Sequence, residues 1–155
     1  MRKGYTYYVE MPSTAITAAK TLLQIKAGAA ALHILSVYIS QVTKTASEML
    51  EYQLLRKSAA ATVTSQTPLK LNPGDPASLA SGGTSSTGYN ASAEGTNSDI
   101  IHKVHWNVLN GYDLYLPIPE GRIHVPQGGI LGVKLNTAPA ASMNLIVGVQ
   151  FEEFQ

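Results

Sequence analysis

The sequence predicts an all-β fold, an antiparallel β-sandwich of jelly-roll-like form with about eight or nine strands. Two observations support this prediction. Apolar residues come in short bursts, and the clearest of these alternate with polar residues as half-buried strands do. In the second half of the chain, turn-forming residues interrupt the bursts roughly every eight to twelve residues. The interruptions are Asn110-Gly111, Pro119-Glu120-Gly121, Gln127-Gly128-Gly129 and Ala138-Pro139.

The first half of the chain contains the earlier candidate strands. Residues 5–10 are rich in tyrosine, threonine and valine, and we expect Pro12 to close this segment. Residues 21–26 follow, and residues 32–42 form the clearest strand, because apolar and polar side chains alternate along it. Its mostly apolar face has His33, Leu35, Val37 and Ile39, and its other face has Ser36, Tyr38 and Ser40.

Residues 49–57 allow two interpretations. Apolar and polar residues alternate from Leu50 to Leu54 as in a strand, whereas Ser47 and Glu48 before them could start one or two helical turns. The strand is favoured because the neighbouring segments are β. Weaker β-prone segments lie at 60–64 and 69–71, and the later strands are expected at 100–109, 114–118, 122–125, 130–135 and 145–151.

The chain of 155 residues is expected to form one domain, residues 13–155, preceded by an N-terminal arm, residues 1–12. Residues 72–99 are polar and rich in glycine, and we expect them to form a long loop. Loops of more than about 12–15 residues are uncommon in compact domains and are usually functional or disordered. With Leu79 and Tyr89 as its only large apolar residues, this loop must lie over a surface or be ordered by a neighbour.

Composition excludes several classes of protein. The chain has no cysteine, which excludes disulfide scaffolds, zinc-thiolate sites, iron–sulfur clusters and cysteine nucleophiles. Its formal net charge of +1 argues against nucleic-acid binding. Only 14% of residues are charged, against about 25% in ordinary soluble domains, as is common where other subunits cover the surface. We expect no secretory signal and no membrane span, since the longest apolar stretch, residues 27–39, is interrupted and too short.

No set of catalytic residues is recognisable in the sequence. His102 and His105 are three residues apart, which places them on opposite faces of a strand and argues against a shared metal ion. Residues 119–124 are similar to half of the second metal-binding motif of cupins, but the other ligands of that motif are missing. None of the serines lies in a Gly-x-Ser-x-Gly elbow. We therefore expect no enzymatic activity, no cofactor and no metal.

Tyrosines supply the candidate contact residues. Tyrosine and arginine are favoured in protein–protein contacts because they bury area at low entropic cost. The residues expected in such contacts are Arg2, Lys3, Tyr5, Tyr7 and Tyr8 of the arm, together with Tyr89 of the long loop. An edge strand whose tyrosines lie on the sandwich would explain the same pattern. Trp106 shares a strand face with Val104 and Val108, so we expect it in the core.

Several short strings give the chain, from residue 13 onward, a family resemblance. They are LLRKSAAATVT (54–64), NPGDP (72–76), GGT (82–84), GYN (88–90), EGT (94–96), NVLNG (107–111), PxPE (117–120) and RIxVP (122–126). In these strings the chain resembles a group of small virion-associated proteins of tailed bacteriophages, including capsid decoration or cement proteins. Residues 1–12 lie outside the resemblance.

The resemblance implies a β-sandwich without active site or cofactor that binds the outside of a phage head and bridges capsid subunits. Its partners would be the major capsid protein and further copies of itself, as a dimer or trimer, without nucleic acid or membrane. It would be made in the host cytoplasm and be located on the capsid exterior of the virion. The competing hypothesis is a carbohydrate-binding sandwich, either a lectin or a head-fibre module, which predicts an exposed aromatic platform. A cupin-type enzyme is the third hypothesis and would need a metal bound partly through His124.

Overall fold

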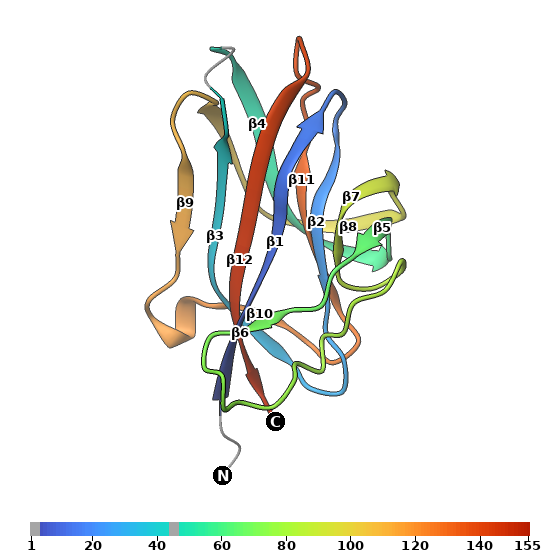
Figure 1. The fold of residues 1–155 in the computed structure, drawn as a ribbon, viewed down its shortest axis with the longest axis vertical. Coiled ribbons are helices and arrows are strands. Elements are labelled where there is room, and N and C mark those ends of the chain that lie inside the picture. Colours follow the sequence, from blue (N-terminus) through green and yellow to red (C-terminus); the bar gives the residue numbers. More distant parts are fainter. Residues whose placement is uncertain (1–3, 44–46) are drawn as a thin grey trace.

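The structure is a computed structural model that describes residues 4–43 and 47–155 (Figure 1). In these residues twelve β-strands form two six-stranded sheets, and the 3-10 helix η1 (Pro119–Gly121) is the only helical element. The all-β class is therefore confirmed, with more strands than the eight or nine expected. The strands are β1 (Gly4–Ile16), β2 (Lys20–Lys26), β3 (Leu32–Gln41), β4 (Met49–Ala59), β5 (Thr62–Ser65), β6 (Leu69–Lys70), β7 (Gly88–Ala93), β8 (Thr96–Asn107), β9 (Tyr112–Tyr115), β10 (Ile123–Val125), β11 (Ile130–Leu135) and β12 (Met143–Phe154).

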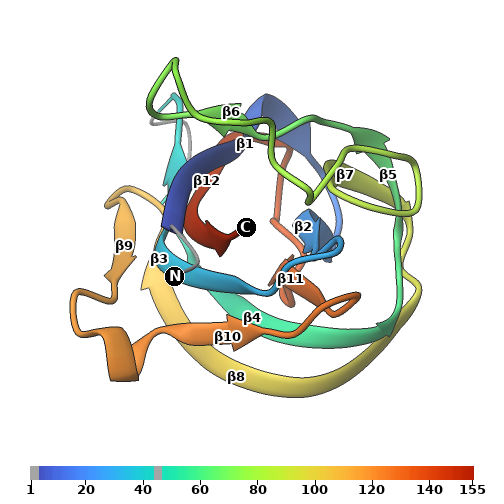
Figure 2. The same cartoon turned by 90° about the horizontal axis from the view of Figure 1, so that it is seen from below.

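The two sheets face each other as a sandwich. In sheet 1 the strand order is β10-β3-β12-β1-β6, and β9 also pairs with β3. In sheet 2 the order is β5-β7-β2-β11-β4-β8. Among the described residues every pairing between these strands is antiparallel, which confirms the antiparallel sandwich. Figure 2 shows the sheets from below, surrounding a common interior.

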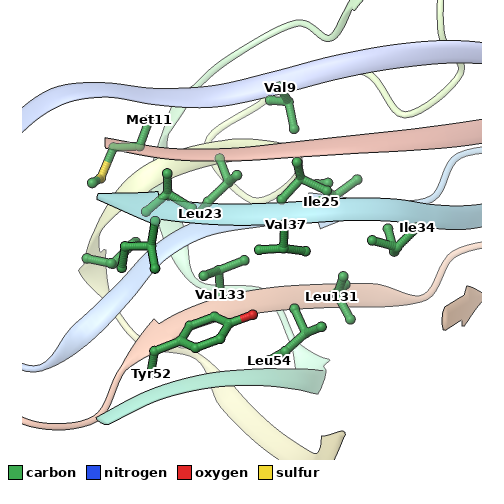
Figure 3. Packing of buried hydrophobic residues seen from close by; sticks show 14 of the residues in the cluster. Val9, Met11, Leu23, Ile25, Ile34, Val37, Tyr52, Leu54, Leu131 and Val133 are labelled. Atoms are coloured by element: carbon green, nitrogen blue, oxygen red, sulfur yellow. The ribbon is translucent and has the colours of Figure 1, made fainter. Parts of the chain in front are cut away.

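Alternation along the strands directs one set of side chains into the space between the sheets. On β12, Val147 and Val149 are fully buried, whereas Ile146 and Gln150 beside them are partly exposed. Figure 3 shows side chains from β1, β2, β3, β4 and β11 meeting in this space. Burying one such apolar side chain contributes roughly 1.5–3 kcal/mol, so this core is the main source of stability. Trp106, only 5% exposed, belongs to it as expected.

Residues 4–12 are part of the sandwich and do not form an arm. They belong to β1, which lies between β12 and β6 in sheet 1. Tyr7 and Met11 are fully buried, so this segment contributes to the core. Pro12 does not end the strand, as had been expected. The pairing of β1 with β12 shifts register between Met11 and Thr14, and this bulge accommodates Pro12, which has no N–H to donate.

The loop expected at residues 72–99 is shorter in the structure. Its second half contains β7 and the start of β8, so the connection without named strands covers residues 71–87. Glu153, a fully buried residue of β12, holds this connection at the lower end of the sandwich. Its carboxylate accepts hydrogen bonds from Ser78 Oγ at 2.7 Å and from the Leu79 N–H at 2.8 Å. The domain itself therefore orders the polar segment through charge-assisted hydrogen bonds.

Strands β5 and β7 extend sheet 2 beside β2 and are anchored through Gln24. The Gln24 side chain is fully buried, and its Nε2 donates to the Ala61 carbonyl at 3.0 Å and to the Ser86 carbonyl at 2.6 Å. Its Oε1 accepts from the Ala61 N–H at 2.9 Å. Ala61, Val63 and Ala91 pack together beside it as a small second core. One amide side chain thus satisfies three backbone groups of the segment between β4 and β8.

Candidate functional site

Tyr7, one of the expected contact residues, is a core residue. Its ring packs against Phe151, with ring centroids 5.6 Å apart. Its hydroxyl donates to the Pro76 carbonyl at 3.2 Å and accepts from the Gln155 amide at 3.1 Å. Burial, together with the nearby Glu153 carboxylate, raises the pKa of Tyr7 to about 12. Tyr7 therefore links β1 to the C-terminal strand and the polar connection, and it presents no surface to a partner.

The structure does not gather the other expected contact residues at one place. Tyr5 on β1 and Tyr89 on β7 are partly buried and pack against the main core. Arg2 and Lys3 lie outside the described residues. Of the expected residues that the structure describes, only Tyr8 lies on the outer face of sheet 1, because it alternates with buried residues of β1. This outer face is the candidate site.

A row of outward side chains crosses sheet 1 from one edge to the other. The strand registers pair each member with the next, and the row consists of Tyr115, Ser36, Gln150, Tyr8 and Leu69. Its two ends are the most exposed, with Tyr115 67% and Leu69 59% accessible. None of the five side chains is charged. The row therefore presents an aromatic and an aliphatic edge around an uncharged centre.

The next row is built around Tyr38 and Gly148, which are register partners on β3 and β12. The Tyr38 ring lies across Gly148, where any Cβ would overlap it. Its hydroxyl is hydrogen-bonded to the hydroxyl of Tyr8, which in turn donates to Glu10 Oε2 at 2.6 Å. Burial and the hydrogen bond to Glu10 raise the pKa of Tyr8 far above its ordinary value. The Tyr8 hydroxyl therefore stays protonated, and its hydrogen bonds to Glu10 and Tyr38 fix the two rings on the outer face.

A charged cluster lies on the same face where β10 pairs with the start of β3. Arg122 Nη1 donates to Glu152 Oε2 at 2.9 Å, and both side chains are about one-fifth exposed. His33 and His124 are register partners, with ring centroids 5.2 Å apart. Burial lowers the pKa of His33, and the neighbouring His124 and Arg122 add to this, while Glu152 opposes it. One carboxylate thus lies beside an arginine and two histidines.

Sequence alternation located part of this face. Ser36, Tyr38 and Ser40 were expected on the non-core side of their strand, and all three are partly exposed. His33 and Leu35 were expected on the apolar side, and this was wrong. A register shift between β3 and β12 at Gln150 and Phe151 introduces a bulge. In the first half of β3 the residues that face the core are therefore Leu32 and Ile34. Leu69 and Tyr115 were missed as site residues, because only the pairing of distant strands places them in the row.

The histidines of β8 have separate partners. His102 Nε2 is hydrogen-bonded to the Tyr112 hydroxyl at 2.8 Å, and His105 Nε2 lies 2.9 Å from Glu51 Oε2. Among the described residues no group of three or more His, Cys, Asp or Glu side chains is placed to hold a metal ion. Within residues 4–43 and 47–155 there is also no helix with the length and apolar character needed to cross a membrane.

Comparison with known proteins found no match, either to a protein-family model or to a curated protein.

Proposed function

We propose that this chain is a non-enzymatic structural protein of a phage virion, a capsid decoration (cement) protein that binds the outside of the head and stabilises it. The observation that carries the proposal is the row across sheet 1, with exposed Leu69 and Tyr115 at its edges and Ser36 and Gln150 between them. Such a surface suits burial against another protein, because anchoring side chains are available and no charge in the row has to be desolvated.

The partners in this proposal are the major capsid protein and further copies of the chain, as a dimer or trimer on the capsid exterior. The row spans four inter-strand steps of about 4.8 Å, roughly 19 Å. A standard interface buries ~800 Å² on each partner, so the contact would also take in the neighbouring rows of the same face. A protein that binds the assembled shell in preference to free subunits stabilises the shell by mass action.

The sequence strings shared with virion-associated proteins support the same function from other parts of the chain. Residues 72–76 lie in the connection held by Glu153, and residues 107–111 form the turn between β8 and β9. Tyr8, Leu69 and Tyr115 lie outside all of these strings. The resembling strings therefore lie in parts of the fold outside the row on sheet 1. In this proposal the outer face of sheet 1 is the surface with which this chain binds its capsid.

The finer fold in this proposal is a jelly roll, in which one long antiparallel ribbon is wound on itself. The strand pairs support it. β1 pairs with β12, β2 with β11, β3 with β9 and β10, and β4 with β8. First strands thus pair with last strands throughout, and β5, β6 and β7 are an insertion between β4 and β8. Jelly rolls are common in viral capsid proteins, which agrees with a role on a virion.

The test is co-sedimentation of the purified protein with heads of its own phage that lack it. The double variant Leu69→Ser/Tyr115→Ser should bind at least about tenfold more weakly, because it removes both anchors of the row. Ile100→Ser is the matched control, since Ile100 is 52% exposed on β8 of sheet 2, and it should bind like the parent. Equal binding by the double variant would reject the sheet 1 face. Failure of the parent to bind heads would reject the decoration function.

Carbohydrate binding is the second candidate function, and the placement of Tyr38 favours it. The ring lies on Gly148, is partly exposed, and has the hydroxyl and amide side chains of Ser36 and Gln150 in the adjacent row. A fixed aromatic ring next to polar groups is the arrangement with which proteins bind the apolar face of a sugar ring. Saturable glycan binding that Tyr38→Ala abolishes, with no binding to heads, would establish this function in place of the first.

A further inference from the structure

A cavity of about 190 Å³ lies at the lower end of the sandwich, where β4 and β8 meet the turn between β10 and β11. Its border includes Arg56, Lys57, Ser98, Val125, Pro126 and Ile130. The cavity has a structural cause, because the register between β4 and β8 shifts three times over this stretch. Such bulges bend a strand away from its neighbour, and Figure 2 shows β8 curving outside β4. The site is distinct from the outer face of sheet 1.

The lysine of the cavity already has its partners. Lys57 Nζ is fully buried and donates to the Glu94 carbonyl at 2.7 Å and to Asn97 Oδ1 at 2.6 Å. The Glu94 carboxylate lies 3.8 Å from the ammonium group and also accepts from Thr21 Oγ1 at 2.8 Å. The ammonium group of Lys57 therefore has its hydrogen-bond partners within the fold, and what remains for the cavity wall is its aliphatic stem.

The arginine of the cavity has no such partner. Arg56 is partly buried, and its Nη2 donates to the His124 carbonyl at 3.2 Å. Within the described part of the chain Arg56 has no carboxylate at ion-pair distance, since the ion pairs there are formed by Lys57, His105 and Arg122. A guanidinium has five N–H donors, so most of its donors remain for a ligand. Its planar donor arrangement matches a carboxylate.

The apolar part of the cavity wall is held in place. Val125 and Ile130 are 3% and 8% exposed, and Pro126 lies between them in the chain. The turn that joins β10 to β11 is closed by a hydrogen bond from the Gly129 N–H to the Pro126 carbonyl at 2.8 Å. It is also bonded to the end of β2, where the Ala27 N–H donates to the Gly129 carbonyl at 2.9 Å. The wall is therefore formed before any ligand binds.

We propose that this cavity binds a small organic carboxylate with an apolar body, with the carboxylate on Arg56 and the body against Val125, Pro126 and Ile130. The size is adequate, because an apolar cavity of about 150 Å³ accommodates benzene. The Ser98 hydroxyl at the border supplies a further donor to the anion. A free acid and the C-terminus of another polypeptide present the same chemistry to this site.

The test is a titration of the intact protein with benzoate, followed by backbone amide NMR shifts. Benzoate should shift the amides of Arg56, Ser98 and Gly129 saturably, whereas benzamide, without the charge, and acetate, without the apolar body, should bind at least about tenfold more weakly. N-acetylvaline serves as a model of a polypeptide C-terminus. If it binds more tightly than benzoate, the ligand of the cavity is the C-terminus of a polypeptide. Equal binding of benzoate and benzamide, or no shift with either acid, would overturn the proposal.

Two variants test the contribution of the Arg56 charge and that of the cavity volume separately. Arg56→Gln should weaken benzoate binding at least about tenfold, and Ser98→Phe should block the cavity while Arg56 remains. Lys103→Gln is the matched control, because it removes one positive charge from an exposed position on β8. Equal weakening by Arg56→Gln and Lys103→Gln would show a nonspecific charge effect and contradict the proposal. Because the titration needs no phage heads, its outcome is independent of the decoration function.

Discussion

The ring of Tyr38 on β3 lies across the neighbouring strand β12 at Gly148. A Cβ at position 148 would overlap the ring carbons and the hydroxyl of Tyr38, so this placement requires a glycine. From there the Tyr38 hydroxyl reaches Tyr8 of β1, which is bonded to Glu10 on the same strand, so side chains of β3 and β1 are joined across β12 on the outer face. The candidate surface therefore depends on the absence of one side chain.

Gly148→Ala should displace the Tyr38 ring. We expect the free energy of unfolding to decrease by about 1–3 kcal/mol, the usual cost of inserting a methyl group where no space exists. Urea denaturation measures it. Gly121→Ala is the control, because a Cβ there meets nothing within 4 Å and should change stability by less than about 0.5 kcal/mol. If the two variants were equally stable, the ring would not depend on Gly148.

Tyr8→Phe should cost about 1–2 kcal/mol of unfolding free energy. It removes the hydrogen bond to the Glu10 carboxylate at 2.6 Å and the bond to the Tyr38 hydroxyl, and bonds to charged acceptors are the stronger class. Tyr115→Phe is the matched control, since its side chain is 67% exposed and stability should stay unchanged. Thermal and urea unfolding of both variants would show the difference. A Tyr8→Phe variant as stable as the parent would contradict the hydroxyl arrangement.

Gln24→Ala should loosen β5 and β7. Three backbone groups of the segment between β4 and β8 would lose their partner, and each buried unsatisfied group costs about 1–3 kcal/mol, so we expect a loss of at least about 2 kcal/mol. Amide hydrogen exchange should accelerate first in Thr62–Ser65 and Gly88–Ala93. Gln127→Ala, at an exposed turn position, should change neither quantity. Uniform acceleration over the whole domain would contradict a local anchoring role of Gln24.

The His33 cluster should make the fold less stable in acid. Burial and the neighbouring His124 lower the pKa of His33 below its ordinary 6.5, so the unfolded chain binds the proton more readily. As the pH falls through about 6.5, the unfolded state gains protons relative to the folded state, and stability decreases.

The measurement is the urea midpoint at about pH 7.5 and at about pH 5.5, a window above the ordinary pKa of carboxyl groups. The urea midpoint of the parent should be lower at the acidic pH than at the higher pH, and this decrease should be smaller in His33→Gln. The groups that face His33 are His124 and Arg122 beside β10 and Glu152 on β12, and the variant leaves all three in place. An unchanged difference in His33→Gln would assign the acid effect to other groups.

Local patterning predicted the interior strands well. The strand expected at 130–135 coincides with β11, and the ambiguous segment 49–57 is a strand within β4. Trp106 was placed in the core for the right reason, because it shares its strand face with apolar neighbours. In each case burial on at least one side imposes an apolar pattern that a short window of sequence displays.

The pairing of strands distant in the chain, and the hydrogen bonds by which buried polar side chains hold loops, leave no such pattern in a short window of sequence. Residues 5–10 were expected to be a β-prone segment within an N-terminal arm, and their place inside sheet 1 was not predicted because their partner β12 lies at the opposite end of the chain. Gly88–Ala93 was predicted as loop, because Tyr89 is its only large apolar residue and the segment shows no clear strand pattern. Nor does the sequence mark Gln24 or Glu153 as anchors, since each acts on backbone groups distant in the chain. The outer face of sheet 1 arises from these pairings.

Hydroxyl-radical footprinting of the protein, free and bound to heads, is the direct test of the proposal that the outer face of sheet 1 binds the capsid. We expect the oxidation of Tyr115 and Leu69 to fall on binding, while Ile100 on sheet 2, of similar exposure, stays as reactive as in the free protein. Protection of Ile100 with continued oxidation of Tyr115 and Leu69 would contradict it and place the contact on the other side of the sandwich.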